Sequence, residues 1–205
     1  MNKTLKLVLN IVLTVIILVL AYLVYDSIMR PVRFNRINDT RRAAVINNLK
    51  DIRDIQRYYK LETGAYAKDF PTLLGFAEQG QIPVVSIIPD PTDTTNTRSI
   101  KDTIGFVSVR DTLFRKRDNF RLEDIAIIPY SDNIPFEMKI DSLDRGGVKV
   151  YVFEARALNN AFLTKDMEEY KQEVINLNSK LEQLDRYPGL KVGSLTEVST
   201  DGNWE

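Results

Sequence analysis

The chain has 205 residues, of which 44% are hydrophobic, and its 28 Lys and Arg residues balance 28 Asp and Glu residues. It contains neither Cys nor His, which excludes disulfides, Cys and His metal sites and every catalytic triad built on imidazole. Without Lys3, Lys6 and Asp26 the chain keeps 26 basic and 27 acidic residues, so it lacks the basic excess of a nucleic-acid-binding domain and we expect no nucleic-acid partner.

The N-terminal segment predicts a transmembrane anchor at residues 1–29. Nineteen consecutive residues without a charge extend from Leu7 to Tyr25, and at about 1.5 Å per residue they nearly match a hydrocarbon core of about 30 Å. Tyr22 and Tyr25 stand where membrane-interface aromatic anchors are expected. A cleaved signal peptide is the alternative, but the apolar run is too long and no small-x-small cleavage site follows it.

Polar residues in and around this segment bear on pairing and orientation. Asn10 and Thr14 share a helix face, where they could bond a partner span or be tolerated as single polar residues. Lys3 and Lys6 precede the span, and five arginines follow it: Arg30, Arg33, Arg36, Arg41 and Arg42. This count favours a cytoplasmic domain, whereas N-terminal anchors of this shape are commonly followed by an exported domain, which is the orientation that we expect.

The next segment predicts a jointed, amphipathic helix at the start of a domain over residues 30–165. Proline restricts the residue before it, so Arg30-Pro31 predicts a break or kink, with a second helix beginning near Asn38-Asp39-Thr40. An apolar stripe with spacings of 4, 3, 3 and 4 consists of Val45, Leu49, Ile52, Ile55 and Tyr59. We expect this face to pack on a sheet and the helix to end near Gly64, because glycine accepts the left-handed C-terminal conformation.

This part of the chain resembles type IV pilins and the pseudopilins of type II secretion. The positions that carry the resemblance are Ile52, Arg53, Ile55, Gln56, Tyr58, Tyr59, Gly64, Tyr66, Phe70 and Leu73. In that family an N-terminal membrane helix continues into an amphipathic helix, a Tyr-rich segment, a Gly-x-Tyr turn and a short Leu-rich helix. The resemblance covers about the first 80 residues. The chain lacks the family's Gly-Phe prepilin peptidase site and the glutamate early in the span.

The resemblance implies a membrane-anchored, non-enzymatic assembly or scaffold subunit of a bacterial cell-envelope machine. It places the anchor in the inner (cytoplasmic) membrane as a single pass and the domain in the periplasm. The bilayer and other membrane or envelope proteins are then the partners. The whole chain is also similar to an uncharacterised family of single-span bacterial proteins, through Tyr187–Leu195 and Gly202-Asn203-Trp204.

After residue 80 the pattern predicts short strands. The predicted strands are 82–88, 104–109, 125–128, 136–140 and 148–154. Asp144-Arg145-Gly146-Gly147 predicts a hairpin between the last two, because Gly-Gly adopts the positive φ angles of a tight turn. A helix followed by mainly antiparallel strands indicates an α+β fold, and we expect the aromatic residues near the helix end to form core between helix and sheet rather than a ligand cage: Tyr58, Tyr59, Tyr66, Phe70 and Phe76.

A C-terminal helix and a docked tail are expected over residues 166–205. The apolar spacing changes to 3, 4, 3, 4 and 3 in a stripe made of Met167, Tyr170, Val174, Leu177, Leu181 and Leu184. Such a stripe can be a partner-helix face or can pack on its own domain. Three heptads are marginal alone, which favours packing on the domain. Leu195 and Trp204 suggest that the tail docks.

Residues for catalysis are few. Asp90 and Asp93 could offer oxygen ligands to calcium, but the EF-hand spacing is missing. Four carboxylates could in principle pair for acid and base chemistry: Asp69, Glu78, Asp111 and Glu123. No phosphate loop or Gly-x-Ser-x-Gly motif occurs, so we predict no catalytic residue, no cofactor and no metal. A membrane-tethered module that binds an envelope polymer or peptide is the alternative to the scaffold subunit.

Overall fold

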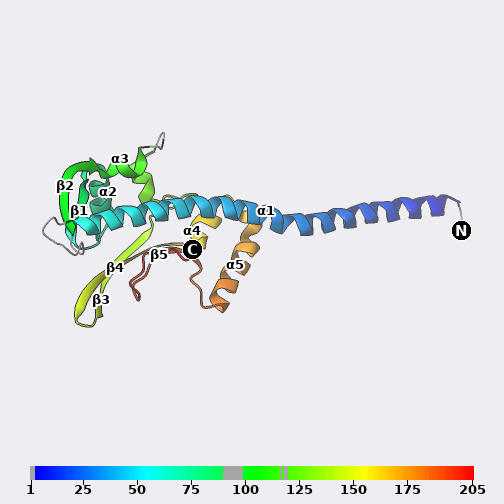
Figure 1. Cartoon of the computed structure of the whole chain (residues 1–205). Coiled ribbons are helices and arrows are strands. Elements are labelled where there is room, and N and C mark those ends of the chain that lie inside the picture. The colour runs from blue at the N-terminus through cyan, green and yellow to red at the C-terminus, as the bar shows by residue number, and fades with distance from the viewer. Residues whose placement is uncertain (1–2, 90–98, 116, 118–119) are drawn as a thin grey trace.

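The computed structural model describes residues 3–89, 99–115, 117 and 120–205. One helix, α1 (Lys3–Thr63, 61 residues), extends along the whole molecule. Its N-terminal half projects away alone, and all the other elements surround its C-terminal half (Figure 1). The remaining elements are, in chain order, α2 (Phe70–Gln79), β1 (Gln81–Pro89), β2 (Ser99–Ser108), α3 (Val109–Phe114), η1 (Leu122–Ala126), β3 (Glu137–Arg145), β4 (Val148–Leu158), α4 (Asn159–Leu163), η2 (Glu168–Tyr170), α5 (Lys171–Gln183) and β5 (Gly189–Gly193).

The predicted break at Arg30-Pro31 is wrong, because α1 continues through Pro31. A proline inside a helix removes one backbone hydrogen bond, and contacts with the C-terminal helical region flank this position. Arg30 Nε lies 2.8 Å from Glu173 Oε1, and the buried ring of Phe34 lies 6.0 Å from that of Tyr170. These contacts fix α1 on both sides of the proline.

The second helix start predicted at Asn38-Asp39-Thr40 is also absent, since all three residues lie inside α1. The Thr40 hydroxyl donates to the Arg36 carbonyl, 3.0 Å away. A threonine in mid-helix often bonds to the carbonyl four residues earlier. Its side chain therefore satisfies itself within the helix and caps nothing.

The C-terminal end of α1 is where the sequence predicts it. The helix ends at Thr63, and Gly64 has φ +81° with its N–H donating to the Lys60 carbonyl at 2.9 Å. After the turn, Asp69 Oδ1 accepts from the Thr72 N–H at 2.8 Å and caps α2. The pKa of Asp69 is lowered chiefly by this backbone hydrogen bond.

The fold is α+β, with two separate antiparallel sheets instead of one. The first is the hairpin β1–β2, and the second has the order β3–β4–β5. The predicted hairpin turn is confirmed: Arg145 pairs with Val148 across Gly146 and Gly147, whose φ angles are +64° and +85°. The predicted strand at 125–128 is wrong, because that segment is the end of the 3₁₀ helix η1 followed by one isolated bridge between Ile127 and Pro135.

The core lies between the C-terminal half of α1 and the second sheet. Four stripe residues of α1 are fully buried, namely Val45, Leu49, Ile52 and Ile55, and Tyr59 is partly buried. Tyr66 is also buried, with its ring 4.7 Å from that of Phe153 in β4. The Tyr59 and Phe76 rings meet edge to face at 5.2 Å, which joins α1 to α2. Burial of these aromatic side chains supplies much of the apolar contact in a domain of this size.

The C-terminal tail docks on the second sheet. Gly202 forms an isolated bridge with Val192 of β5, and the partly buried Trp204 packs against the core. Glu205 Oε1 accepts from Arg53 Nη1 of α1 at 2.7 Å. The chain end is therefore held by both the sheet and the long helix.

Candidate functional site

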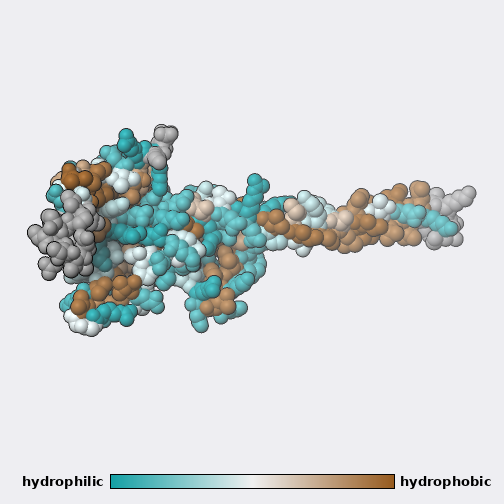
Figure 2. All heavy atoms as spheres, in the orientation of Figure 1, coloured by the Kyte–Doolittle hydropathy of each residue, from teal (hydrophilic) through white to brown (hydrophobic). Residues whose placement is uncertain are grey.

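The N-terminal half of α1 is a large apolar surface that the domain does not cover. Sixteen large apolar side chains between Leu7 and Tyr25 are each at least 47% exposed, and they form the hydrophobic rod in Figure 2. Among the described residues, α1 is the one helix long and apolar enough to cross a membrane, and none of its apolar window is buried. Tyr22 and Tyr25, the predicted interface anchors, are 67% and 56% exposed on this rod.

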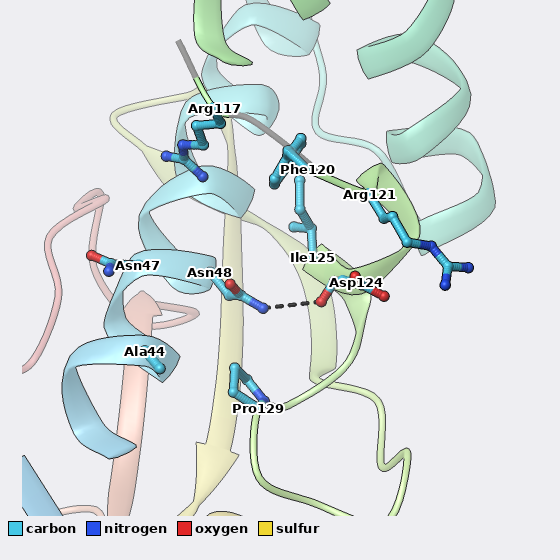
Figure 3. Close-up of a pocket in the computed structure, with 9 residues that line it drawn as sticks. All are labelled: Ala44, Asn47, Asn48, Arg117, Phe120, Arg121, Asp124, Ile125 and Pro129. Atoms are coloured by element: carbon cyan, nitrogen blue, oxygen red, sulfur yellow. Dashed lines mark hydrogen bonds between the residues drawn. The ribbon is translucent and has the colours of Figure 1, made fainter. Parts of the chain in front are cut away.

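A cleft of about 510 Å³ opens in the domain between α1 and the segment around η1. It is shown in Figure 3, and its lining residues are Ala44, Asn47, Asn48, Arg117, Phe120, Arg121, Asp124, Ile125 and Pro129. The cleft is open to solvent along one side. Its two walls come from parts of the chain about seventy residues apart, so its shape depends on how they are held together.

Asn48 holds the two walls of this cleft together. Its Nδ2 atom donates to the carbonyl of Asp124 at 3.0 Å, drawn in Figure 3, and to that of Ile127 at 3.2 Å. Asp124 belongs to η1 and Ile127 is the residue after it, so Asn48 fixes the end of η1 against α1. Asn47, one residue earlier, is exposed at the rim and offers an amide to a ligand.

Arg117 forms the upper end of the cleft, and an acid on α1 fixes its position. Its Nη2 lies 2.7 Å from Oδ1 of the buried Asp51, and its Nη1 bonds to the other carboxylate oxygen. The guanidinium also lies 5.3 Å from the centroid of the Phe120 ring, which stacks on Phe114 at 4.5 Å. The hydrogen bond to Asp51 raises the pKa of Arg117. The ion pair is bidentate, and its charge is largely balanced.

Both arginines that line the cleft are paired with carboxylates. Arg121 pairs with Glu123 at 2.9 Å, so neither lining arginine is an uncompensated cation. Among the described residues no group of three or more acidic side chains is placed to hold a metal ion. The lining offers the exposed amide of Asn47, one aromatic face and paired charges, which suit a neutral, hydrogen-bonding ligand.

The structure does not assemble the four carboxylates singled out from the sequence into one site. Asp69 caps the start of α2, whereas Glu78 lies in its last turn, 3.9 Å from Arg110. Asp111 is in the first turn of α3, and Glu123 is taken by Arg121. Asp90 and Asp93 lie outside the described residues.

The predicted partner-helix face divides into two parts. Met167, Tyr170 and Val174 are buried in the core of this chain. Leu177 and Leu181 are partly buried, and Leu184, just past the end of α5, is 56% exposed. The first half of the stripe therefore packs on its own domain, and only its C-terminal half is accessible to another chain.

A second hollow, of about 420 Å³, lies near the point where α1 leaves the domain. Its lining residues are Arg33, Arg36, Ile37, Thr40, Arg41, Tyr130 and Tyr170. In the sequence these arginines bear only on the orientation of the anchor. Their helical spacing could have shown that they share one face, but nothing in the sequence shows that the two tyrosines close the hollow.

Comparisons of the chain with protein-family models, with curated proteins and with solved structures found no match.

Proposed function

We propose that this protein is a membrane-anchored, non-enzymatic assembly or scaffold subunit of a bacterial cell-envelope machine. The observation that carries the proposal is the single helix α1, whose apolar N-terminal half is bare and whose C-terminal half forms the spine of the domain. A subunit built in this way holds its domain at a fixed position on the bilayer surface. Other envelope proteins can then contact both the span and the domain.

The exposed apolar rod is too costly to remain in water. Covering one half-exposed large apolar side chain gains roughly 1 kcal/mol, so sixteen of them represent roughly 16 kcal/mol. A whole domain is stable by only about 5–15 kcal/mol. A bilayer, or a bilayer and neighbouring spans, is the environment that removes this cost for an uncharged helix of this length.

The resemblance to pilins and pseudopilins supports the assembly role. An uninterrupted helix that passes from an apolar rod into a domain with antiparallel sheets is the arrangement that this resemblance implies. Gly64, Tyr66 and α2 follow in the order of the family's turn and short helix. Because the peptidase site is missing, we propose an accessory subunit that stays in the inner membrane.

A periplasmic domain is part of the proposal, although the arginine count after the span favours the cytoplasm. Three of these arginines have structural roles. Arg30 pairs with Glu173, Arg33 lies 3.7 Å from Asp26, and Arg41 is buried against backbone carbonyls. These contacts give the arginines a role in the folded domain that is independent of membrane topology.

The cleft between α1 and η1 favours a second candidate function, a tethered module that binds an envelope polymer or peptide. Its amide, aromatic and paired-charge lining suits sugar hydroxyls or peptide groups. Asn47→Ala is the sharpest test, because Asn47 lines the rim and its side chain is exposed. Loss of polymer retention in this variant would favour the binding module.

Membrane fractionation tests the anchor. Ile16→Arg places a charge at the middle of the span, where it costs about 2.5–3.5 kcal/mol on insertion, and should move a large share of the protein out of the membrane fraction. Val148→Arg, on an exposed apolar residue of the β3–β4 hairpin, is the matched control and should fractionate normally. Normal retention of Ile16→Arg would refute the anchor.

Cysteine labelling tests the orientation in this cysteine-free chain. Lys149→Cys places a thiol on the exposed hairpin, and Thr14→Cys places one within the span as the protected control. A membrane-impermeant maleimide should label Lys149→Cys in cells whose outer membrane alone is permeable. Labelling only after lysis of the inner membrane would put the domain in the cytoplasm.

A span exchange tests the assembly role itself. Replacing residues 7–25 with an unrelated apolar sequence of equal length keeps the anchor but changes its surface. We expect the exchanged protein to remain in the membrane and to lose copurifying membrane proteins. Retention of the same partners would leave the domain as the binding surface, and the absence of partners for both proteins would refute the scaffold role.

A further inference from the structure

The hollow near the exit of α1 points to a lipid contact of defined chemistry. We propose that it binds the phosphate group of an anionic phospholipid headgroup, such as that of phosphatidylglycerol. The inference rests on the membrane anchoring in the proposed function and goes beyond it, since it assigns a ligand to a pocket of the domain.

One face of α1 supplies the basic wall of the hollow. Arg33, Arg36, Thr40 and Arg41 have the spacing of neighbours on one helix face. Guanidinium groups are the side chains best suited to a phosphate, because each presents several N–H donors in a planar fork. The Thr40 hydroxyl adds a small polar group between the arginines.

Arg41 is the strongest reason to expect an anion here. It is only 8% exposed, and within the described residues its hydrogen bonds go from Nη1 to the carbonyls of Phe162 at 2.8 Å and Lys165 at 2.7 Å. No carboxylate of the described residues lies within ion-pair distance of it. Burying a charge without a counter-charge is expensive, and an anion in the hollow would offset this cost.

Tyr130 is held in an unusual conformation at the opposite wall. Its φ is +61°, in the left-handed region that bulky residues rarely adopt. In this conformation its ring stands 5.0 Å from the Arg41 guanidinium carbon. Strained residues persist where the surrounding structure fixes them, often at binding sites. Here the strain places an aromatic wall with a hydroxyl group over the buried cation.

The acidic groups near the hollow each have a partner, which for Asp26 is the lining residue Arg33, and Glu169 lies beside the lining residue Tyr170. Glu173 pairs with Arg30 at 2.8 Å, and Asp26 lies 3.7 Å from Arg33. Arg36 is exposed, and in the described part of the chain it has no carboxylate partner. The lining itself contains three arginines and no acid, so its net charge is positive.

The N-terminal end of the hollow, at Arg33, faces the headgroup layer, and its inner end, at Arg41, lies about 24 Å past Tyr25 along the helix axis. Arg33 and Arg36 lie eight and eleven residues after Tyr25, which is about 12 and 16 Å along the helix axis. Headgroups extend about 5–7 Å beyond the hydrocarbon core. Side chains on a helix tilt towards its N-terminus, which is the bilayer side here, so both guanidinium groups reach towards the phosphates. Ile28 and Val32 are exposed and apolar, and they allow α1 to sink below Tyr25.

Native mass spectrometry of the full chain in detergent can measure this binding with short-chain lipids. Dihexanoyl phosphatidylglycerol is water-soluble, so the measurement does not depend on whether α1 inserts in a bilayer. We expect a saturable single adduct with phosphatidylglycerol and a weaker one with dihexanoyl phosphatidylcholine. Arg36→Gln should weaken the phosphatidylglycerol adduct about fivefold, the contribution of one basic residue at an anionic surface. Arg110→Gln, an exposed arginine of α3, is the matched control and should not change it.

The outcomes separate the alternatives. Equal adducts for both lipids, or equal binding by Arg36→Gln and the unchanged chain, would overturn the proposal. Competition by inorganic phosphate at the concentration of the lipid would show that a soluble phosphate is the occupant and would overturn the lipid assignment. If the adduct behaves as expected while Ile16→Arg fractionates normally, the headgroup site stands and the anchor fails; the opposite pattern removes the site alone.

Discussion

Replacing Gln56 with leucine should lower the free energy of unfolding of the domain by about 3 kcal/mol. Gln56 lies on α1 with 0% of its surface exposed. Its Oε1 accepts from the Ala67 N–H at 2.8 Å, and its Nε2 donates to the Ala67 carbonyl at 3.0 Å. One side-chain amide therefore satisfies both backbone groups of a buried loop residue and ties the turn after α1 to the helix.

The magnitude follows from the two groups that lose their partner. Leucine fills nearly the same volume but offers no hydrogen bond, so the buried N–H and C=O of Ala67 both become unsatisfied. Each such group costs about 1–3 kcal/mol, and the added apolar burial returns part of the sum. For a domain of this size a loss of 3 kcal/mol lowers Tm by about 6–12 °C.

Thermal unfolding of the full chain in detergent micelles can measure the effect, with fluorescence of Trp204, the only tryptophan, as the signal. Gln172→Leu is the matched control, because Gln172 is exposed on α5 and should change stability by less than about 0.5 kcal/mol. If the free energy of unfolding of Gln56→Leu lies within about 1 kcal/mol of that of the unchanged chain, the amide does not hold the loop and the reasoning fails.

A glutamate at the same position adds a pH test of this reading. In Gln56→Glu, burial and the neighbouring Ala67 carbonyl raise the pKa of the introduced carboxyl in the folded state. Its contribution to stability is then complete below the unfolded pKa of about 4.3 and is lost as pH rises through the folded pKa. We therefore expect the stability that this variant loses relative to the unchanged chain to be smallest in acid and to grow as pH rises, and a difference independent of pH would contradict the assignment.

Two further predictions concern a turn and an ion pair. Gly64→Ala should lower the free energy of unfolding by about 1 kcal/mol, measured as a lower Tm. The only opposition to the added methyl group is backbone strain at φ +81°, since no atom lies within 4 Å of it. Gly75→Ala in α2 is the control, because its methyl group also meets no neighbour and should not lower Tm. The hydrogen bond from Arg156 lowers the pKa of Glu137 from 4.5 to about 2. This pair should stabilise the fold above about pH 4.5 and less as pH falls towards 2, and Glu137→Gln should remove that part of the acid-unfolding slope; an unchanged slope would show that the pair contributes nothing.

Patterns local in the chain were predictable from the sequence. The end of α1 depends on Gly64, and the β3–β4 hairpin depends on Gly146 and Gly147, whose positive φ angles other residues resist. The apolar rod was evident from the uncharged run between Leu7 and Tyr25. Each of these features is decided by a few neighbouring residues, so tertiary structure did not change them.

Features decided by distant contacts were not predictable. The break expected at Pro31 is removed by the docking of Arg30 and Phe34 against the C-terminal helical region. The apolar run of residues 125–128 suggested a strand, yet Asn48 takes the carbonyls of Asp124 and Ile127 and holds this segment in η1 and a turn.

The strand β5 was missed because it is short and bounded by glycines. Its signal in the sequence was the pair of glycines at its ends, Gly189 and Gly193. In the structure a Cβ on Gly189 would lie 2.2 Å from the Ala157 carbonyl oxygen, and one on Gly193 would lie 2.2 Å from that of Phe153. Glycines on both sides of an apolar pair therefore indicated a close backbone approach. Neither hollow could be predicted from the sequence, because each joins α1 to residues far along the chain. The cleft joins α1 to residues about seventy positions away, and the hollow near the exit of α1 joins it to residues about ninety or more positions away.

Because α1 is continuous, the number of helical residues between the anchor and the domain fixes the orientation of the domain around the helix axis. Each residue rotates an α-helix by about 100° and lengthens it by about 1.5 Å. The number of residues between Tyr25 and Phe34 therefore sets the rotation of the domain about the helix axis. One residue inserted after Ile28 would swing every surface of the domain about 100° around the helix axis while raising it only about 1.5 Å. Seven residues would restore the direction to within about 20° but raise the domain by about 10 Å. For proteins that contact the anchor, the length of this short stretch of helix therefore specifies both the rotation of the domain about the helix axis and its distance from the membrane.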